Sequence, residues 1–169
     1  ANGPFFGAPE LSTDEFPILD PARNSATTLQ APDRDANTPS TKDDPVVAPS
    51  PYWGDEAIWD SKANAHNPML DRQGRVWYTA RIRSRANPAF CKQGSDHPSA
   101  KLFPVEQSGR QLAVYEPKSE KYTFVDTCFS THHLQFAEDA NDTLWTSGGG
   151  QVVGWLDTTL AELPRDTGF

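Results

Sequence analysis

The stretch from Cys128 to Gly150, CFSTHHLQFAEDANDTLWTSGGG, contains the residues of this chain that are best suited to chemistry. Two adjacent histidines, His132 and His133, are followed by an acidic pair that begins at Glu138. A neutral imidazole can bind a divalent metal or accept a proton near physiological pH. The same stretch is also typical of a β-hairpin followed by a glycine turn. The residue types therefore leave three interpretations open: a metal site, a proton-transfer site and an ordinary hairpin.

The charge and hydropathy of the chain exclude two classes of partner. Its 169 residues carry a formal net charge of -8. Binding to nucleic acid requires clustered lysine and arginine, and so does docking on an anionic membrane surface. The sequence also lacks a run of 18 apolar residues, the length that a membrane-spanning helix needs. We therefore expect neither nucleic-acid binding nor membrane insertion.

Composition divides the chain into two parts. Residues 1–50 are rich in proline and acidic residues and lack tryptophan and tyrosine, which predicts an extended arm or linker with little regular structure. All five tryptophans and all four tyrosines lie in residues 51–169, where we expect the core. The arm should pack on residues 51–169 or on another chain, because it offers few apolar side chains of its own.

Short runs of β-branched and aromatic residues predict that the second part is all-β. The expected strands lie within residues 75–82, 111–117, 121–127, 142–147 and 151–157. Two pairs of these runs are separated by turn-forming residues at hairpin spacing. Residues 158–169 could begin a short helix, which Pro164 would end.

An internal repeat is visible within this β-rich part. Residues 71–77, DRQGRVW, align without gaps on residues 139–145, DANDTLW. Asp71 and Asp139 should each open a tight turn, with Gly74 and Asp142 in the left-handed conformation. The two copies are further apart in the sequence than the blades of a propeller, which repeat at about 40–50 residues. The excess falls in residues 83–109, which we interpret as an insertion.

Trp77 and Trp145 occupy equivalent positions in the two copies, and both are expected in the core. We expect Trp145 to pack beside Trp77 of the neighbouring repeat. Strand alternation should place Leu144 and Thr146 on one face, opposite Trp145.

The two cysteines, Cys91 and Cys128, form no CxxC motif. They are either two free thiols or a disulfide, and the disulfide is our prediction. It would tether the insertion to the end of the strand within residues 121–127, and it would indicate an oxidising compartment.

The motif D-x-x-G-x-V-W-Y-T at residues 71–79 and the later Glu116-Pro117 with Tyr122 resemble the blade repeat of virginiamycin B lyase (streptogramin lyase) propellers. A broader likeness, carried by residues 87–104, 131–150 and 152–156, is to large bacterial exported proteins. In those proteins a carboxypeptidase-regulatory-like domain and a haem-attachment region precede such a propeller. This chain has no CxxCH motif and thus no haem attachment of its own.

The resemblance implies a partial β-propeller of about two blades, a fragment that needs the remaining blades of a parent chain or another protein chain as partner. It also implies a periplasmic or secreted location. In such blades the residues before the innermost strand line the central channel, so His66 and His133 should lie close together at the channel mouth. These two histidines, with Glu138, are the expected ligands of a divalent metal.

Two functions follow from the resemblance. The first is a periplasmic module that binds a ligand or partner, within a larger exported and possibly redox-associated protein. The second is a lyase-like enzyme, since the lyase family uses a channel-mouth histidine for proton transfer together with a magnesium ion. His133 or His132 would then be the catalytic residue, beside His66 as a ligand-binding residue. The binding module is the leading hypothesis, because the sequence offers no convincing nucleophile or set of carboxylates.

Overall fold

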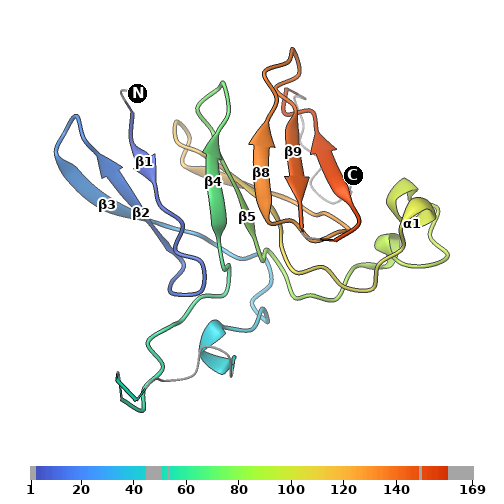
Figure 1. Ribbon diagram of the computed structural model, residues 1–169, viewed down its shortest axis with the longest axis horizontal. Coiled ribbons are helices and arrows are strands. Elements are labelled where there is room, and N and C mark those ends of the chain that lie inside the picture. The colour runs from blue at the N-terminus through green and yellow to red at the C-terminus, as the bar shows by residue number, and fades with distance from the viewer. Residues whose placement is uncertain (1–2, 45–50, 53, 149, 160–169) are drawn as a thin grey trace.

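The computed structural model describes residues 3–44, 51–52, 54–148 and 150–159, which form three antiparallel sheets that stand side by side (Figure 1). The all-β prediction is therefore confirmed, although within these residues the sheets do not close into a barrel or a propeller ring. The N-terminal sheet contains β1 (Phe5–Phe6), β2 (Glu15–Asp20) and β3 (Ser25–Gln30). The central sheet contains β4 (His66–Leu70), β5 (Val76–Ala80), β6 (Gln111–Glu116) and β7 (Lys121–Val125). The C-terminal sheet contains β8 (His133–Phe136), β9 (Leu144–Ser147) and β10 (Val153–Leu156).

The helical elements are short and lie in the connections. In the described part of the chain they are the 3-10 turns Thr41–Asp43 and Ala89–Cys91 and the helix α1 (Pro98–Leu102). Among the described residues, none of these helices has the length or the apolar character needed to cross a membrane. The short helix expected in the tail falls mostly on residues 160–169, outside the described residues.

The central sheet is covered on both faces, which explains why all five residues of β5 are buried. On one face, Tyr78 and Ala80 pack against Phe16 of β2, whose ring meets that of Tyr78 edge-on at 4.7 Å between centroids. On the other face, Trp77 packs with Leu134 and other residues of the C-terminal sheet. The two layers of apolar side chains hold the three sheets together, because each layer is removed from water by two sheets at once.

The expectation of little regular structure in residues 1–50 is wrong. A six-residue ladder pairs β2 with β3, and β1 extends the sheet on the other side of β2. Asn24 makes the tight turn possible by adopting a positive φ of 48°. Pro17 is tolerated within β2, and its carbonyl accepts a hydrogen bond of 2.8 Å from the Gly7 amide. Proline and acidic residues such as Pro17, Glu15 and Asp20 therefore stand within a strand.

The companion expectation, that the N-terminal part packs on residues 51–169, is confirmed. Phe16 and Ala31 lie in a core cluster whose other members come from residues 63–113. The Asp14 carboxylate accepts hydrogen bonds from the Ser61 hydroxyl and from the backbone amides of Lys62 and Ala63, at 2.7–3.0 Å. Composition changes near residue 50, but the folded core crosses that boundary.

Both repeat turns form as predicted. Gly74 has a φ of 83° and Asp142 a φ of 47°, so each occupies the left-handed position. The Asp71 carboxylate accepts hydrogen bonds from the amides of Gln73 and Arg75, and Asp139 accepts one from the Thr143 amide, each at 2.9 Å. The two repeats therefore correspond in structure as well as in sequence.

The predicted burial of Trp145 against Trp77 is wrong. Trp77 is fully buried, whereas 43% of Trp145 is exposed. Leu144 and Thr146 are buried on the opposite face of β9, as strand alternation predicts. Each tryptophan lies on the face of its own sheet that points away from the N-terminal sheet. For Trp77 that side is covered by the next sheet, while no further sheet of the described residues covers Trp145.

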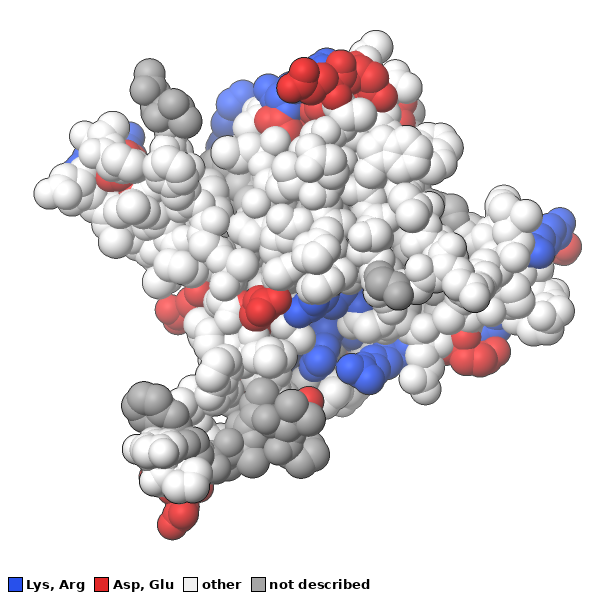
Figure 2. All heavy atoms as spheres, viewed as in Figure 1, with Lys and Arg blue, Asp and Glu red and all other residues white. Residues whose placement is uncertain are grey.

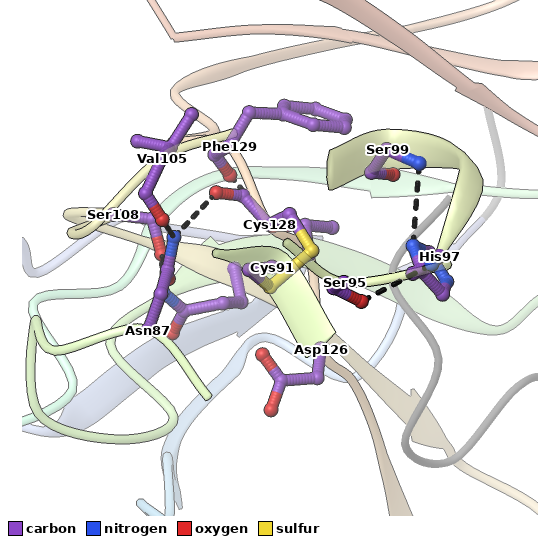
Figure 3. The surroundings of a disulfide bond; sticks show 12 residues. Asn87, Cys91, Ser95, His97, Ser99, Val105, Ser108, Asp126, Cys128 and Phe129 are labelled. Carbon is purple, nitrogen blue, oxygen red and sulfur yellow. Dashed lines mark hydrogen bonds between the residues drawn. A yellow bond between two sulfur atoms is a disulfide. The ribbon is translucent and has the colours of Figure 1, made fainter. Parts of the chain in front are cut away.

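Residues 83–109 form the insertion that was predicted between β5 and β6, and Figure 1 shows it extending beyond β10. The predicted disulfide between Cys91 and Cys128 is present, with the Cα atoms 5.1 Å apart. Beside it, the Asn87 side-chain amide donates hydrogen bonds to the carbonyls of Cys128 and Val105, at 2.7 and 2.8 Å (Figure 3). These contacts fix the insertion to the chain that leaves β7.

A buried ion pair completes the attachment of the insertion. Arg83 Nε lies 2.8 Å from Asp126 Oδ1, and Arg83 Nη2 donates to Asn87 Oδ1 at 2.8 Å. Arg34 Nη2 lies 2.6 Å from the other oxygen of the same carboxylate. Asp126 therefore joins the N-terminal part, the base of the insertion and the end of β7.

Candidate metal centre

Three of the four histidines in the chain lie together at one end of the sheets. His66 begins β4, His133 begins β8, and His132 directly precedes that strand. Because β4 and β8 are neighbouring strands of adjacent sheets, their first residues meet. One imidazole nitrogen from each ring can be chosen so that all three lie within 4.8 Å of one another. The prediction that His66 and His133 converge is confirmed, and His132 joins them.

Hydrogen bonds between the two sheets hold this end of the strands in place. The Thr79 hydroxyl lies within hydrogen-bonding distance of the carbonyls of His132 and His66, at 2.9 and 3.3 Å. The Leu134 amide donates to Asn67 Oδ1 at 2.5 Å. Asn67 has a positive φ of 52° and lies where the register of β4 and β5 shifts. Such irregularities redirect side chains beside functional sites.

The three rings are stacked closely. The centroids of His132 and His133 are 4.1 Å apart, with 28° between the ring planes. The His66 centroid lies 4.4 Å from that of His132 and 5.4 Å from that of His133. Three protonated rings at these separations would repel one another, so the arrangement favours neutral imidazole.

Glu10 and Arg110 flank the histidines. Glu10 Oε1 contacts His66 Nδ1 and lies 3.7 Å from Arg110 Nη2. The Glu10 amide donates to the Ala65 carbonyl at 3.0 Å, which places the carboxylate beside the first residue of β4. A carboxylate on one imidazole nitrogen fixes the ring orientation and leaves the other nitrogen for a ligand. In the described part of the chain neither ring nitrogen of His66 makes a well-formed hydrogen bond; Nδ1 faces the Glu10 carboxylate, and Nε2 is buried without a partner.

Burial lowers the pKa of His66, and the nearby charges of Arg110 and His133 act in the same direction, whereas Glu10 opposes the shift. Burial also lowers the pKa of His132, with further contributions from His66 and His133. Both rings are therefore neutral at neutral pH, which is the protonation state that a metal ligand requires.

Glu138 does not belong to this site. It lies in the turn after β8, at the opposite end of that strand from His133. Five residues of extended chain separate them by roughly 16 Å. Glu138 is thus remote from the three histidines, and Glu10 is the carboxylate beside them. No local pattern pointed to Glu10, because it lies in the connection between β1 and β2 of a sheet that was not expected.

His97, the fourth histidine, lies apart in the insertion. Its Nδ1 accepts a hydrogen bond from the Ser99 amide at 3.2 Å, capping α1 (Figure 3). It makes no contribution to the cluster.

Imidazole ligands suit zinc, copper, nickel and cobalt. A zinc ion held by three histidines at 2.0–2.1 Å in tetrahedral geometry brings the ligand nitrogens to about 3.3 Å from one another. The ligand nitrogens, which lie within 4.8 Å of one another, must therefore draw together by up to about 1.5 Å on binding. The exposed ring of His133 can rotate for this purpose, since it has no side-chain hydrogen bond among the described residues. A fourth coordination position would stay open.

Comparisons of this chain with protein-family models, with curated proteins and with solved structures gave no match. The site is therefore interpreted from its own geometry.

Proposed function

We propose that this chain is a binding module of β-propeller type that holds a divalent transition metal through His66, His132 and His133. The observation that carries the proposal is the convergence of three imidazole nitrogens from two sheets within 4.8 Å. The lowered pKa values of His66 and His132 support it, because a neutral ring needs no deprotonation before it binds a metal.

The propeller part of the proposal is supported by the way the sheets pack. Three antiparallel sheets stack face to face, and equivalent turns open the second strand of the central and C-terminal sheets. The outer face of the C-terminal sheet exposes Trp145, Val153 and Trp155. A further blade, from the same parent chain or from another chain, would cover them as the C-terminal sheet covers Trp77.

An exported location, periplasmic or secreted, belongs to the same proposal. The disulfide between Cys91 and Cys128 supports it, because such bonds persist in oxidising compartments.

Metal titration of the EDTA-treated protein tests the proposal. We expect Co²⁺ to bind with the visible absorption of a tetrahedral site, and Zn²⁺ to displace it. His133→Ala should weaken binding at least about 100-fold, since loss of an outer-shell partner alone costs 10–100-fold. His97→Ala is the matched control and should bind as the unaltered protein does. Equal affinities for the two variants would rule out the site.

One observation favours the alternative of a lyase-like enzyme. Three or fewer protein ligands leave at least one coordination position open, which is the arrangement of catalytic rather than structural metal sites. In this alternative either His132 or His133 would transfer a proton beside a carbonyl or ester instead of binding the metal, and the metal held by the other histidines would stabilise the resulting anion. The test is turnover of model esters by the metal-loaded protein, compared with His133→Ala.

A further inference from the structure

A basic pocket adjoins the histidine cluster. It has a volume of about 320 Å³ and includes Arg81, Arg85, Arg110 and His132 in its lining. Figure 2 shows basic side chains gathered in a hollow below the lower ends of β4 and β8. The chain as a whole carries a charge of -8, so a pocket lined by three arginines runs against its overall charge.

Among the described residues, two of these arginines lack a side-chain partner at hydrogen-bonding distance. Neither Arg81 nor Arg85 forms a side-chain hydrogen bond or an ion pair with another residue of the described part of the chain. Every other arginine there, from Arg23 to Arg110, has such a partner. Arg81 is half-buried, and its pKa is lowered by burial and then by the charge of Arg85, whereas the charge of Asp44 opposes the shift. The guanidinium groups of Arg81 and Arg85 therefore keep N–H donors that an anion in the pocket could use.

The third arginine is held firmly in place. Arg110 donates from Nε to the Asn64 carbonyl at 2.9 Å and from Nη2 to Asn64 Oδ1 at 2.6 Å. Asn64 and Ser130 add polar groups to the same pocket. A guanidinium fixed by its neighbours presents its remaining N–H groups without further loss of side-chain entropy, which suits carboxylate and phosphate recognition.

His132 belongs both to the pocket and to the histidine cluster. A ligand in the pocket can therefore place one end on the arginines and another at the open coordination position of the metal. We propose that the pocket binds the oxyanion group, phosphate or carboxylate, of a small ligand whose other end reaches the metal. The proposal rests on the metal-binding function above for the second contact, while the first contact needs only the arginines.

Calorimetric titration of the metal-free protein tests the first contact alone. Inorganic phosphate and succinate serve as separate probes, which distinguish the two oxyanions. We expect at least one of them to bind, and Arg85→Gln to weaken its binding about 10-fold or more. The exposed side chain of Arg85 makes no hydrogen bond or ion pair to other described residues, and its backbone bond to Ser108 is kept in the variant, which should therefore retain the unfolding midpoint of the unaltered protein.

Arg23→Gln is the matched control, because it removes the same charge from the exposed turn between β2 and β3. It should leave the affinity of the probe unchanged. Binding of neither probe, or equal losses in the two variants, would overturn the proposal, since equal losses indicate only the overall charge.

The second contact is tested by coupling. With Co²⁺ bound, the affinity for the probe should rise at least about 5-fold, and the probe should raise the affinity for Co²⁺ by the same factor. Absence of coupling in a protein that binds both would overturn the bridging ligand. Probe binding through Arg85 in a protein that fails to bind Co²⁺ would uphold the pocket and refute the metal-binding function, so the two failures are distinguishable.

Discussion

The internal repeat allows one aspartate to be compared with its own equivalent. The Asp71 side chain is fully buried and accepts four hydrogen bonds, from two backbone amides, from Arg75 Nε at 2.6 Å and from Trp77 Nε1 at 2.8 Å. Asp139 opens the equivalent turn in an exposed position, where its carboxylate accepts from the Thr143 amide and hydroxyl. Replacing each aspartate in turn therefore compares two losses in the free energy of unfolding: that of a buried hydrogen-bond network at Asp71 and that of an exposed turn at Asp139.

Asp71→Ala leaves the indole N–H of Trp77 buried without an acceptor and the guanidinium of Arg75 without its carboxylate. Breaking a buried pair by removing one partner costs about 3–5 kcal/mol. Asp71→Asn should cost nearly as much. Each carboxylate oxygen accepts from two donors, so the amide nitrogen of asparagine would face two donors whichever oxygen it replaces. Asp139→Ala should cost clearly less, because water can replace its two hydrogen bonds.

Urea unfolding followed by tryptophan fluorescence measures these differences as shifts of the midpoint at constant slope. The reasoning is refuted if Asp139→Ala lowers the midpoint as much as Asp71→Ala does. It is refuted as well if Asp71→Asn is as stable as the unaltered protein, since the charge and acceptor geometry of Oδ2 would then be irrelevant.

Three further predictions concern the disulfide, the shared core and the histidines. Cys91→Ala with Cys128→Ala should lower the free energy of unfolding by about 4 kcal/mol, as the chain-entropy model gives for a 37-residue separation, and an unchanged urea midpoint would contradict this. Phe16→Ala should cost about 3–5 kcal/mol by the same measurement, whereas a negligible cost would show that the N-terminal sheet is not part of the core. Because folding lowers the pKa values of two histidines, the unfolded state binds more protons below about pH 6.5, and stability should fall as the pH drops through that value towards the folded pKa values. This part of the pH dependence should shrink when His66 is replaced by Gln, and its persistence would assign it to other groups.

The elements that could be predicted from sequence are those with strong local signals. The runs that became β5, β6, β7, β9 and β10 have β-branched and aromatic residues next to clear turn residues. Asp71, Gly74 and Asp142 likewise act within their own turns, so a local pattern was enough to place them. The disulfide could be predicted because the chain has only two cysteines, so each has one possible partner within the chain.

The errors arose where the outcome depends on distant neighbours. Strands β1–β3 gain their stability from Tyr78 and Ala113 of the central sheet, which no local pattern in the first 50 residues reveals. Trp145 has the sequence environment of Trp77 but lacks a covering sheet among the described residues. Glu10 and Arg110 reach His66 only because two sheets pack together, so sequence reasoning could place histidines at the site but not their charged neighbours.

Because the central sheet is covered on both sides, its amide protons should behave differently from those of its neighbours. The N-terminal and C-terminal sheets can each open while the other two sheets stay packed, which costs only one of the two apolar layers. The amides of β5 and β6 become accessible to solvent only when both layers are lost, that is, when the whole molecule unfolds. The slowest hydrogen exchange should therefore map to these two strands and report the global free energy of unfolding, with faster, partial openings on either side.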